Sequence, residues 1–199
     1  MCNIRKVAGL DIGNYNGSWD KLFSKSIKVL RKFSQFLLIT DGDTSILDSL
    51  KGKVKVLVQR CLWHIPYQAK YVLWQDGVKH KSAEWLQVMS ELMEICAIRP
   101  LVDCEKTIKK MIESKRKRLE SVIQYCLSKG YTHTTSYLEN AMPDMFTAIE
   151  KRLKGKTTSK VERVMRTINM RVNVSKWSIA GALNVTKIRL AYYYNGFDA

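Results

Sequence analysis

Two short apolar runs, joined by a stretch of helical character, limit the folds open to this chain. Phe36–Thr40 (FLLIT) stops at an Asp-Gly turn that begins at Asp41, and Val54–Val58 follows after a helix-like segment, Ser45–Leu50. Continuous apolar runs of this length are typical of strands buried on both faces of a parallel sheet. Parallel neighbours need a crossover, so the pattern predicts a β-α-β unit.

The segments on either side extend this prediction. Arg5–Ile12 is predicted to be a further strand, and apolar residues recur at helical spacing from Trp19 to Phe33, which gives β-α-β-α-β in all. After Cys61 the chain is expected to be almost entirely helical. The expected helices are Leu62–Trp74, Ser82–Ile95, Asp103–Leu127 ending at Gly130, Thr134–Leu153 broken at Pro143, Lys160–Arg171 and Ser175–Tyr194.

The boundaries of these segments predict an α/β fold interrupted by helices. We expect a partial α/β core over residues 1–76 and an all-helical insertion over 77–155. Residues 156–199 are expected to form C-terminal helices that return to the core.

Charge and cysteine content narrow the class of function. The chain has 34 Lys and Arg against 18 Asp and Glu, a net charge of +16, which attracts polyanions such as nucleic acid. A generally basic set of proteins in the source cell would give the same excess. The five cysteines are scattered and form no CxxC pair, which is typical of reduced intracellular thiols. With no membrane-length apolar run and no secretory signal, we expect a cytoplasmic, nucleoid-associated protein.

Two acidic residues are candidate metal ligands. Asp41 directly follows a buried strand, where open α/β sheets bind their ligands, and its carboxylate suits Mg²⁺ or Mn²⁺. The alternative is an ordinary Asp-Gly turn. Glu162 lies near the start of a predicted helix, where a surface pair with Arg166 four residues later is the alternative.

Basic residues surround Glu162 closely. A single acid among such residues suits a site that binds metal ions and also holds a phosphate backbone. The candidate DNA-binding residues are Lys160, Arg163, Arg166 and Arg171.

Cys61 and His64 form a C-x-x-H pair just after the second apolar run. Thiolate and imidazole bind zinc, but a structural zinc site needs four ligands, and the other histidines lack suitable spacing. We therefore expect the pair to be structural, at a strand-to-helix corner packed with Trp63.

Two further patterns have competing interpretations. Aromatic residues recur at Trp63, Tyr67, Tyr71, Trp74 and Trp85. They could stack on bases, but helical spacing favours packing in the core. The basic run over residues 115–118 is expected to be a solvated helix face, with phosphate contact as the alternative.

The order of these motifs resembles Mutator-like DDE transposases and related bacterial and archaeal insertion-sequence transposases. The similar segments are Leu37-Leu38-Ile39-Thr40-Asp41-Gly42, Gln59-Arg60-Cys61-Leu62-Trp63-His64, and Ser159-Lys160-Val161-Glu162-Arg163 after an all-helical insertion. Gly13 to Trp19 also resembles the family's turn into the helix before the Asp strand, so the likeness covers nearly the whole chain.

This resemblance implies a ribonuclease H-like core with two divalent ions, Mg²⁺ or Mn²⁺, held by three acids. Asp41 would be the second acid and Glu162 the third. One ion activates water or a DNA 3′-hydroxyl, and the other stabilises the leaving oxygen. The implied partner is DNA, as transposon ends and target, bound by a homodimer or a larger assembly.

The first acid of the triad is not accounted for. Asp11 maps to the third strand of the family's sheet, about 14 Å from Asp41, whereas the two metals lie about 4 Å apart. We therefore expect an N-terminally incomplete transposase fragment, inactive alone. In a full-length parent, Asp41→Ala and Glu162→Ala should each abolish strand cleavage. A non-catalytic, basic DNA-binding remnant and a nuclease on the same fold are the alternatives.

Overall fold

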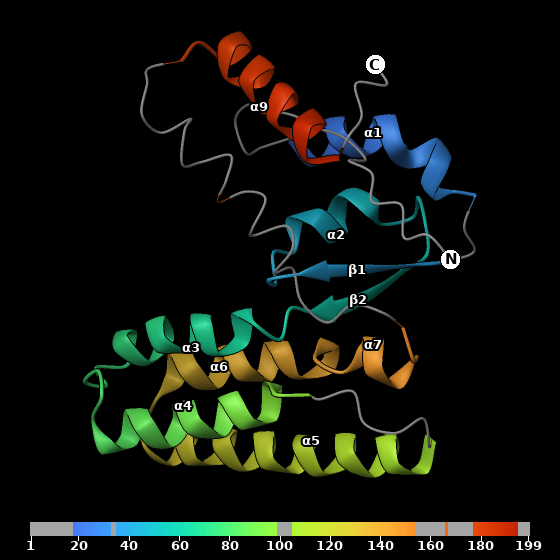
Figure 1. The fold of residues 1–199 in the computed structure, drawn as a ribbon. Coiled ribbons are helices and arrows are strands. Elements are labelled where there is room, and N and C mark those ends of the chain that lie inside the picture. The colour runs from blue at the N-terminus through green and yellow to red at the C-terminus, as the bar shows by residue number, and fades with distance from the viewer. Residues whose placement is uncertain (1–17, 33–34, 99–104, 154–165, 167–176, 195–199) are drawn as a thin grey trace. The chain divides into compact units, whose positions relative to one another are not determined.

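The computed structural model describes residues 18–32, 35–98, 105–153, 166 and 177–194 (Figure 1). The chain divides into two compact units. The first unit takes in residues 1–36, 43–56 and 159–199, and the second unit takes in residues 37–42 and 57–158. The predicted strand Arg5–Ile12 and the predicted helix Lys160–Arg171 fall largely or wholly outside the described residues.

Strands β1 (Phe36–Thr40) and β2 (Val56–Arg60) pair in a two-stranded parallel sheet (Figure 1). The pairing runs to the carboxyl end, where the Cys61 amide donates to the Thr40 carbonyl at 2.8 Å. β1 has the predicted bounds. β2 begins two residues later than the predicted Val54, because the chain is still turning there after the preceding helix. A mixed, mainly helical α/β fold is confirmed for the described part of the chain.

The first unit contains three described helices, α1 (Ser18–Leu30), α2 (Ser45–Leu50) and α9 (Ile179–Tyr194). α1 packs against α2, and Lys53 and Asp20 form an exposed ion pair at 3.0 Å. The Ser178 hydroxyl accepts from the Gly181 amide at 3.1 Å in the first turn of α9. α1 and α2 lie where helices were predicted, whereas α9 begins at Ile179, later than the predicted Ser175.

The second unit is built mainly from helices that follow β2 in sequence. They are α3 (His64–Gln75), α4 (Ala83–Cys96), α5 (Glu105–Ser128), α6 (Thr132–Ala141), the short 3-10 helix η1 (Met142–Asp144) and α7 (Thr147–Glu150). The Ser82 hydroxyl caps α4 by accepting from the Trp85 amide at 3.2 Å. Gly130, at φ +75°, follows the end of α5, and Pro143 lies where α6 gives way to η1, as predicted.

Fully buried apolar side chains from these helices form one core. α3 packs on α4 and α6, and α5 packs on α4, α6 and α7. Leu73, Leu92, Leu119, Leu138 and Phe146 are entirely buried at the centre. Each side chain of this size stabilises the fold by about 1.5–3 kcal/mol when it leaves water. The helical unit therefore has a substantial core of its own.

The aromatic residues of α3 contradict the expectation of core packing. Trp63, Tyr67, Tyr71 and Trp74 are all exposed, and Trp74 is the most exposed at 74%. The buried face of α3 consists instead of Ile65, Ala69, Val72 and Leu73, which also recur at helical spacing. An amphipathic surface helix buries one face against its neighbours and leaves the opposite face in water. Trp85 differs, since it is partly buried against the core.

The basic run of α5 is also not a simple solvated face. Lys115 is buried, and its ammonium donates to the Glu94 carbonyl in the last turn of α4 at 2.6 Å. That carbonyl has no partner within its own helix, so Lys115 caps the helix end. Burial lowers the pKa of Lys115, and nearby Glu94 opposes this shift. Arg116 and Arg118 pair with Glu150 and Glu91, each at 2.8 Å.

No described helix has the length and apolar character needed to cross a membrane.

Asp76 connects the end of α3 to the start of α6. Its carboxylate accepts from the amides of His133 and Thr134 at 2.9 and 2.8 Å, and from the Thr134 hydroxyl at 2.7 Å. Asp76→Ala should lower the free energy of unfolding by about 1–2 kcal/mol, because the first turn of α6 loses its acceptor. Urea unfolding measures the effect. Asp76→Asn, which keeps one acceptor oxygen, should lose less, and equal losses would contradict this role.

Candidate functional site

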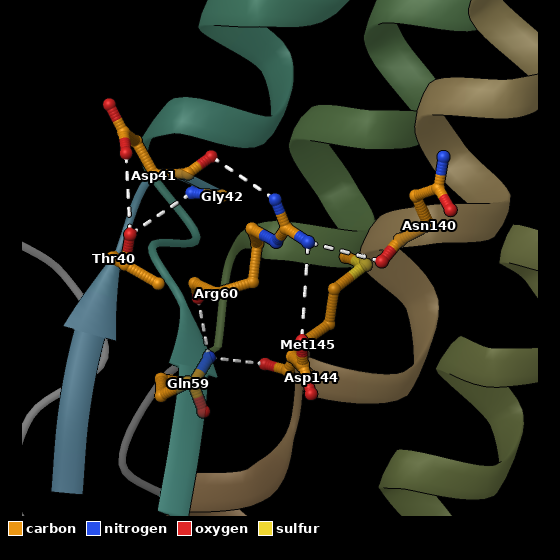
Figure 2. A network of polar contacts seen from close by, with 8 residues as sticks. All are labelled: Thr40, Asp41, Gly42, Gln59, Arg60, Asn140, Asp144 and Met145. Carbon is orange, nitrogen blue, oxygen red and sulfur yellow. Dashed lines mark hydrogen bonds and ion pairs between the residues drawn. The ribbon is translucent and has the colours of Figure 1, made fainter. Parts of the chain in front are cut away.

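Asp41 follows β1 directly, at the carboxyl end of the sheet, and its carboxylate is exposed. The buried Thr40 hydroxyl organises the turn, as Figure 2 shows. It donates to Asp41 Oδ1 at 3.3 Å and accepts from the Gly42 amide at 3.2 Å. The strand therefore presents a carboxylate at its end, in a turn held by Thr40, at the place where open α/β sheets bind their ligands.

The Asp43 carboxylate bonds to the start of α2. Its Oδ1 accepts from the Ser45 amide at 2.9 Å and from the Ser45 hydroxyl at 2.6 Å. These bonds complete the first turn of α2, so the carboxylate of Asp43 is engaged in local structure. Asp41 is the more exposed of the two and is therefore the better candidate for a metal ligand.

Arg60 holds the backbone of Asp41 in place. Its Nη1 donates to the Asp41 carbonyl at 3.3 Å, and its Nη2 donates to the Asn140 carbonyl at 3.1 Å (Figure 2). Nη2 also lies 4.0 Å from a carboxylate oxygen of Asp144. Partial burial raises the pKa of Asp144, and Arg60 offsets only part of this shift. One guanidinium thus fixes the turn after β1 relative to the end of α6 and to η1.

Gln59 makes the deepest polar connection of the site. The side chain is fully buried, and its Nε2 donates to the carbonyls of Met145 and Arg60, each at 2.6 Å (Figure 2). Its Oε1 accepts from the Ala148 amide at 2.8 Å. A buried amide with all these partners joins β2 to a segment more than 80 residues later in the sequence.

Cys61 and His64 form the corner between β2 and α3. Cys61 is fully buried, its carbonyl accepts from the His64 amide at 3.0 Å, and the partly buried His64 ring lies edge-on to Trp63 at 5.0 Å. The Tyr137 hydroxyl reaches the His64 carbonyl at 3.5 Å. Burial raises the pKa of Tyr137, with Arg60 opposing and Asp41 adding to the shift, so the phenol stays protonated beside the site. Trp63 itself is exposed rather than packed into the corner.

The structure describes only part of the predicted site. Glu162, Lys160, Arg163 and Arg171 lie outside the described residues, and Arg166 is described only as an exposed helical residue. Within the described ranges, no three His, Cys, Asp or Glu side chains lie close enough together to hold a metal ion. The roles assigned to these residues stay predictions.

The sequence identified Asp41 as a candidate site residue, but it did not identify the later residues that bond to Gln59 and Arg60. Asn140, Asp144 and Met145 lie far downstream and carry no motif of their own. The available signal was the polar Gln59-Arg60 pair at the end of an otherwise apolar strand, because polar groups in such a place need partners.

The chain has no match among protein-family models, curated proteins or solved structures. Its site is therefore interpreted from its own residues.

Removing the buried amide should be costly. Gln59→Leu keeps the approximate volume but leaves the Met145 carbonyl and the Ala148 amide without their partner, so the free energy of unfolding should fall by about 2–4 kcal/mol. Gln68→Leu, at an exposed position of α3, is the control and should change it by less than about 0.5 kcal/mol. Urea unfolding compares the two variants, and similar losses would argue against the role of Gln59.

Two features favour glycine at position 42. Its φ is +118°, and a Cβ there would overlap the Arg60 guanidinium. Gly52 has a φ of +72° with open space around it. Gly42→Ala should destabilise the fold by more than Gly52→Ala, which carries the backbone strain of about 1 kcal/mol without the overlap. The difference in urea midpoint measures the overlap together with the less favourable φ at Gly42, and a larger loss at Gly52 would contradict the prediction.

Proposed function

We propose that this chain is part of the catalytic domain of a DDE-type DNA transposase with a ribonuclease H-like core. In this proposal Asp41 and Glu162 are two of the carboxylates that bind the catalytic metal ions. DNA is the substrate, as transposon ends and target, and the acting species is a homodimer or a larger assembly.

The position of Asp41 is the observation that carries the proposal. An exposed carboxylate lies at the carboxyl end of a parallel strand, and Arg60 and Thr40 fix the turn that presents it. The next strand leads through Cys61 and His64 into an all-helical unit. This order, with Glu162 after the helices in sequence, is the order of motifs in the transposase family that the sequence resembles.

In this proposal Asp41 and Glu162 are the residues that would hold Mg²⁺ or Mn²⁺. Such ions prefer carboxylate oxygens, and Asp41 and Glu162 would supply them. A pair of bound ions would supply Lewis-acid activation of the attacking hydroxyl and stabilisation of the leaving oxygen. Arg60 lies on the carbonyl side of Asp41, so it orients the turn and leaves the carboxylate exposed. Tyr137, kept protonated by burial, adds no competing charge.

The charge of the chain supports DNA as the substrate. A net charge of +16 favours a polyanion, and neutralised phosphates release counterions. Lys160, Arg163, Arg166 and Arg171 are proposed to contact the phosphate backbone beside Glu162. The charge alone also fits a non-catalytic DNA-binding remnant, which is the second candidate function.

Metal binding separates these two functions. Calorimetry should detect Mn²⁺ binding to the wild-type chain, and Asp41→Asn should abolish it, because the amide cannot replace the charged ligand. Asp48→Asn, at an exposed carboxylate on α2, is the matched control and should bind Mn²⁺ as the wild type does. Mn²⁺ binding that survives in Asp41→Asn would overturn the assignment of Asp41. DNA binding without any Mn²⁺ binding would favour the remnant.

The contribution of Glu162 needs its own measurement. Fe²⁺ placed in the same site, with ascorbate and peroxide, generates radicals that cut the backbone close to the ion. Cuts near residues 41 and 162 are expected in the wild type, and both should disappear in Glu162→Gln. Cuts near residue 41 alone in the wild type would show that Glu162 is not a ligand of the metal ion.

A further inference from the structure

A shallow apolar groove lies between the C-terminal half of α3 and the start of α4. Its volume is about 410 Å³, and it is lined by Lys70, Tyr71, Trp74, Val78, His80 and Trp85. Tyr71 is 45% exposed and Trp74 is 74% exposed, so much of both side chains is accessible to solvent. All the lining residues belong to the second unit.

Three aromatic side chains of the groove, Tyr71, His80 and Trp85, have neighbours that hold them. Trp85 packs partly into the core, and the His80 ring meets it edge-on with centroids 4.7 Å apart. The Lys70 ammonium lies over the Tyr71 ring at 4.8 Å and over the Tyr67 ring at 3.9 Å. Rings fixed in this way lose little conformational entropy when a flat ligand stacks on them.

The charges around the groove favour an anionic ligand. α3 contains no Asp or Glu, and Lys79 and Lys81 are exposed in the loop that leads to α4. The two nearest acids in sequence have other partners. Asp76 caps α6, as described above, and Glu84 bonds within the start of α4 to Ser82.

We propose that this groove binds an unstacked base of single-stranded DNA, with Tyr71 and Trp74 as the stacking surfaces and Lys70 facing the neighbouring phosphate. Open aromatic faces with interspersed cations are how proteins bind single strands without sequence preference. The bases of an intact duplex are covered by their neighbours and do not enter. The choice of DNA over RNA rests on the proposed function, whereas the stacking rests on the groove alone.

The test compares oligonucleotides that differ only in their bases. Binding of a fluorescent dT oligonucleotide, followed by anisotropy, should weaken about tenfold in Trp74→Ala and in Tyr71→Ala. An abasic oligonucleotide of equal length keeps the phosphates, and these two variants should bind it as the wild type does. Lys70→Ala should weaken binding to both oligonucleotides. Leu127→Ala, at an exposed apolar position of α5, is the control and should change neither affinity.

Several outcomes would overturn the proposal. Wild-type affinity of Trp74→Ala and Tyr71→Ala for the dT oligonucleotide would exclude stacking in the groove, and equal losses on the abasic strand would assign the effect to charge. A change from dimer to monomer in Trp74→Ala, by light scattering and with unchanged DNA binding, would show that a second copy occupies the groove. Tighter binding of an rU oligonucleotide would exclude DNA as the preferred strand. Mn²⁺ binding at Asp41 is measured separately, so either proposal can fail without the other.

Discussion

The buried amide of Gln59 is the interaction on which the arrangement of the second unit depends. Strand β2 ends at the surface of a helical core, where its polar groups would otherwise face apolar side chains. Both polar atoms of the Gln59 side chain bond to the backbone after η1. Nε2 donates to the Met145 carbonyl, and Oε1 accepts from the Ala148 amide. These hydrogen bonds fix the position of the end of β2 along the helices. The next residue, Arg60, is thereby placed within hydrogen-bonding distance of the carbonyls of Asp41 and Asn140.

The main elements could be predicted because each one has a local cause. The apolar run FLLIT gives β1, the Ser82 cap gives the start of α4, and Pro143 marks the break after α6. The start of β2 could not be placed as well, since the turn after α2 continues through Val54. Apolarity alone does not distinguish a turn residue from a strand residue.

The faces of α3 show a second limit of sequence patterns. An aromatic row and an aliphatic row both recur at helical spacing, and each predicts a buried face. Ala69 and its aliphatic neighbours allow α4 and α6 to approach closely, whereas rings on that side would hold them apart.

The candidate site could also be predicted only in part. The position of Asp41 followed from one strand end, but Asn140 and Asp144 are connected to it through Arg60 only in the folded chain. Glu162 stays a prediction from its motif.

The ion pairs of α5 have a consequence for how the charge of this chain is understood. Lys115 caps α4, Arg116 meets Glu150, and Arg118 meets Glu91, so these cations already have partners within the fold. The net charge of +16 sets the attraction that a distant polyanion feels. Close binding to a phosphate backbone depends instead on which lysine and arginine side chains have N–H donors that are not already bonded within the fold. Long-range attraction is therefore set by all the charges of the chain, whereas close binding is set by a subset of its lysines and arginines.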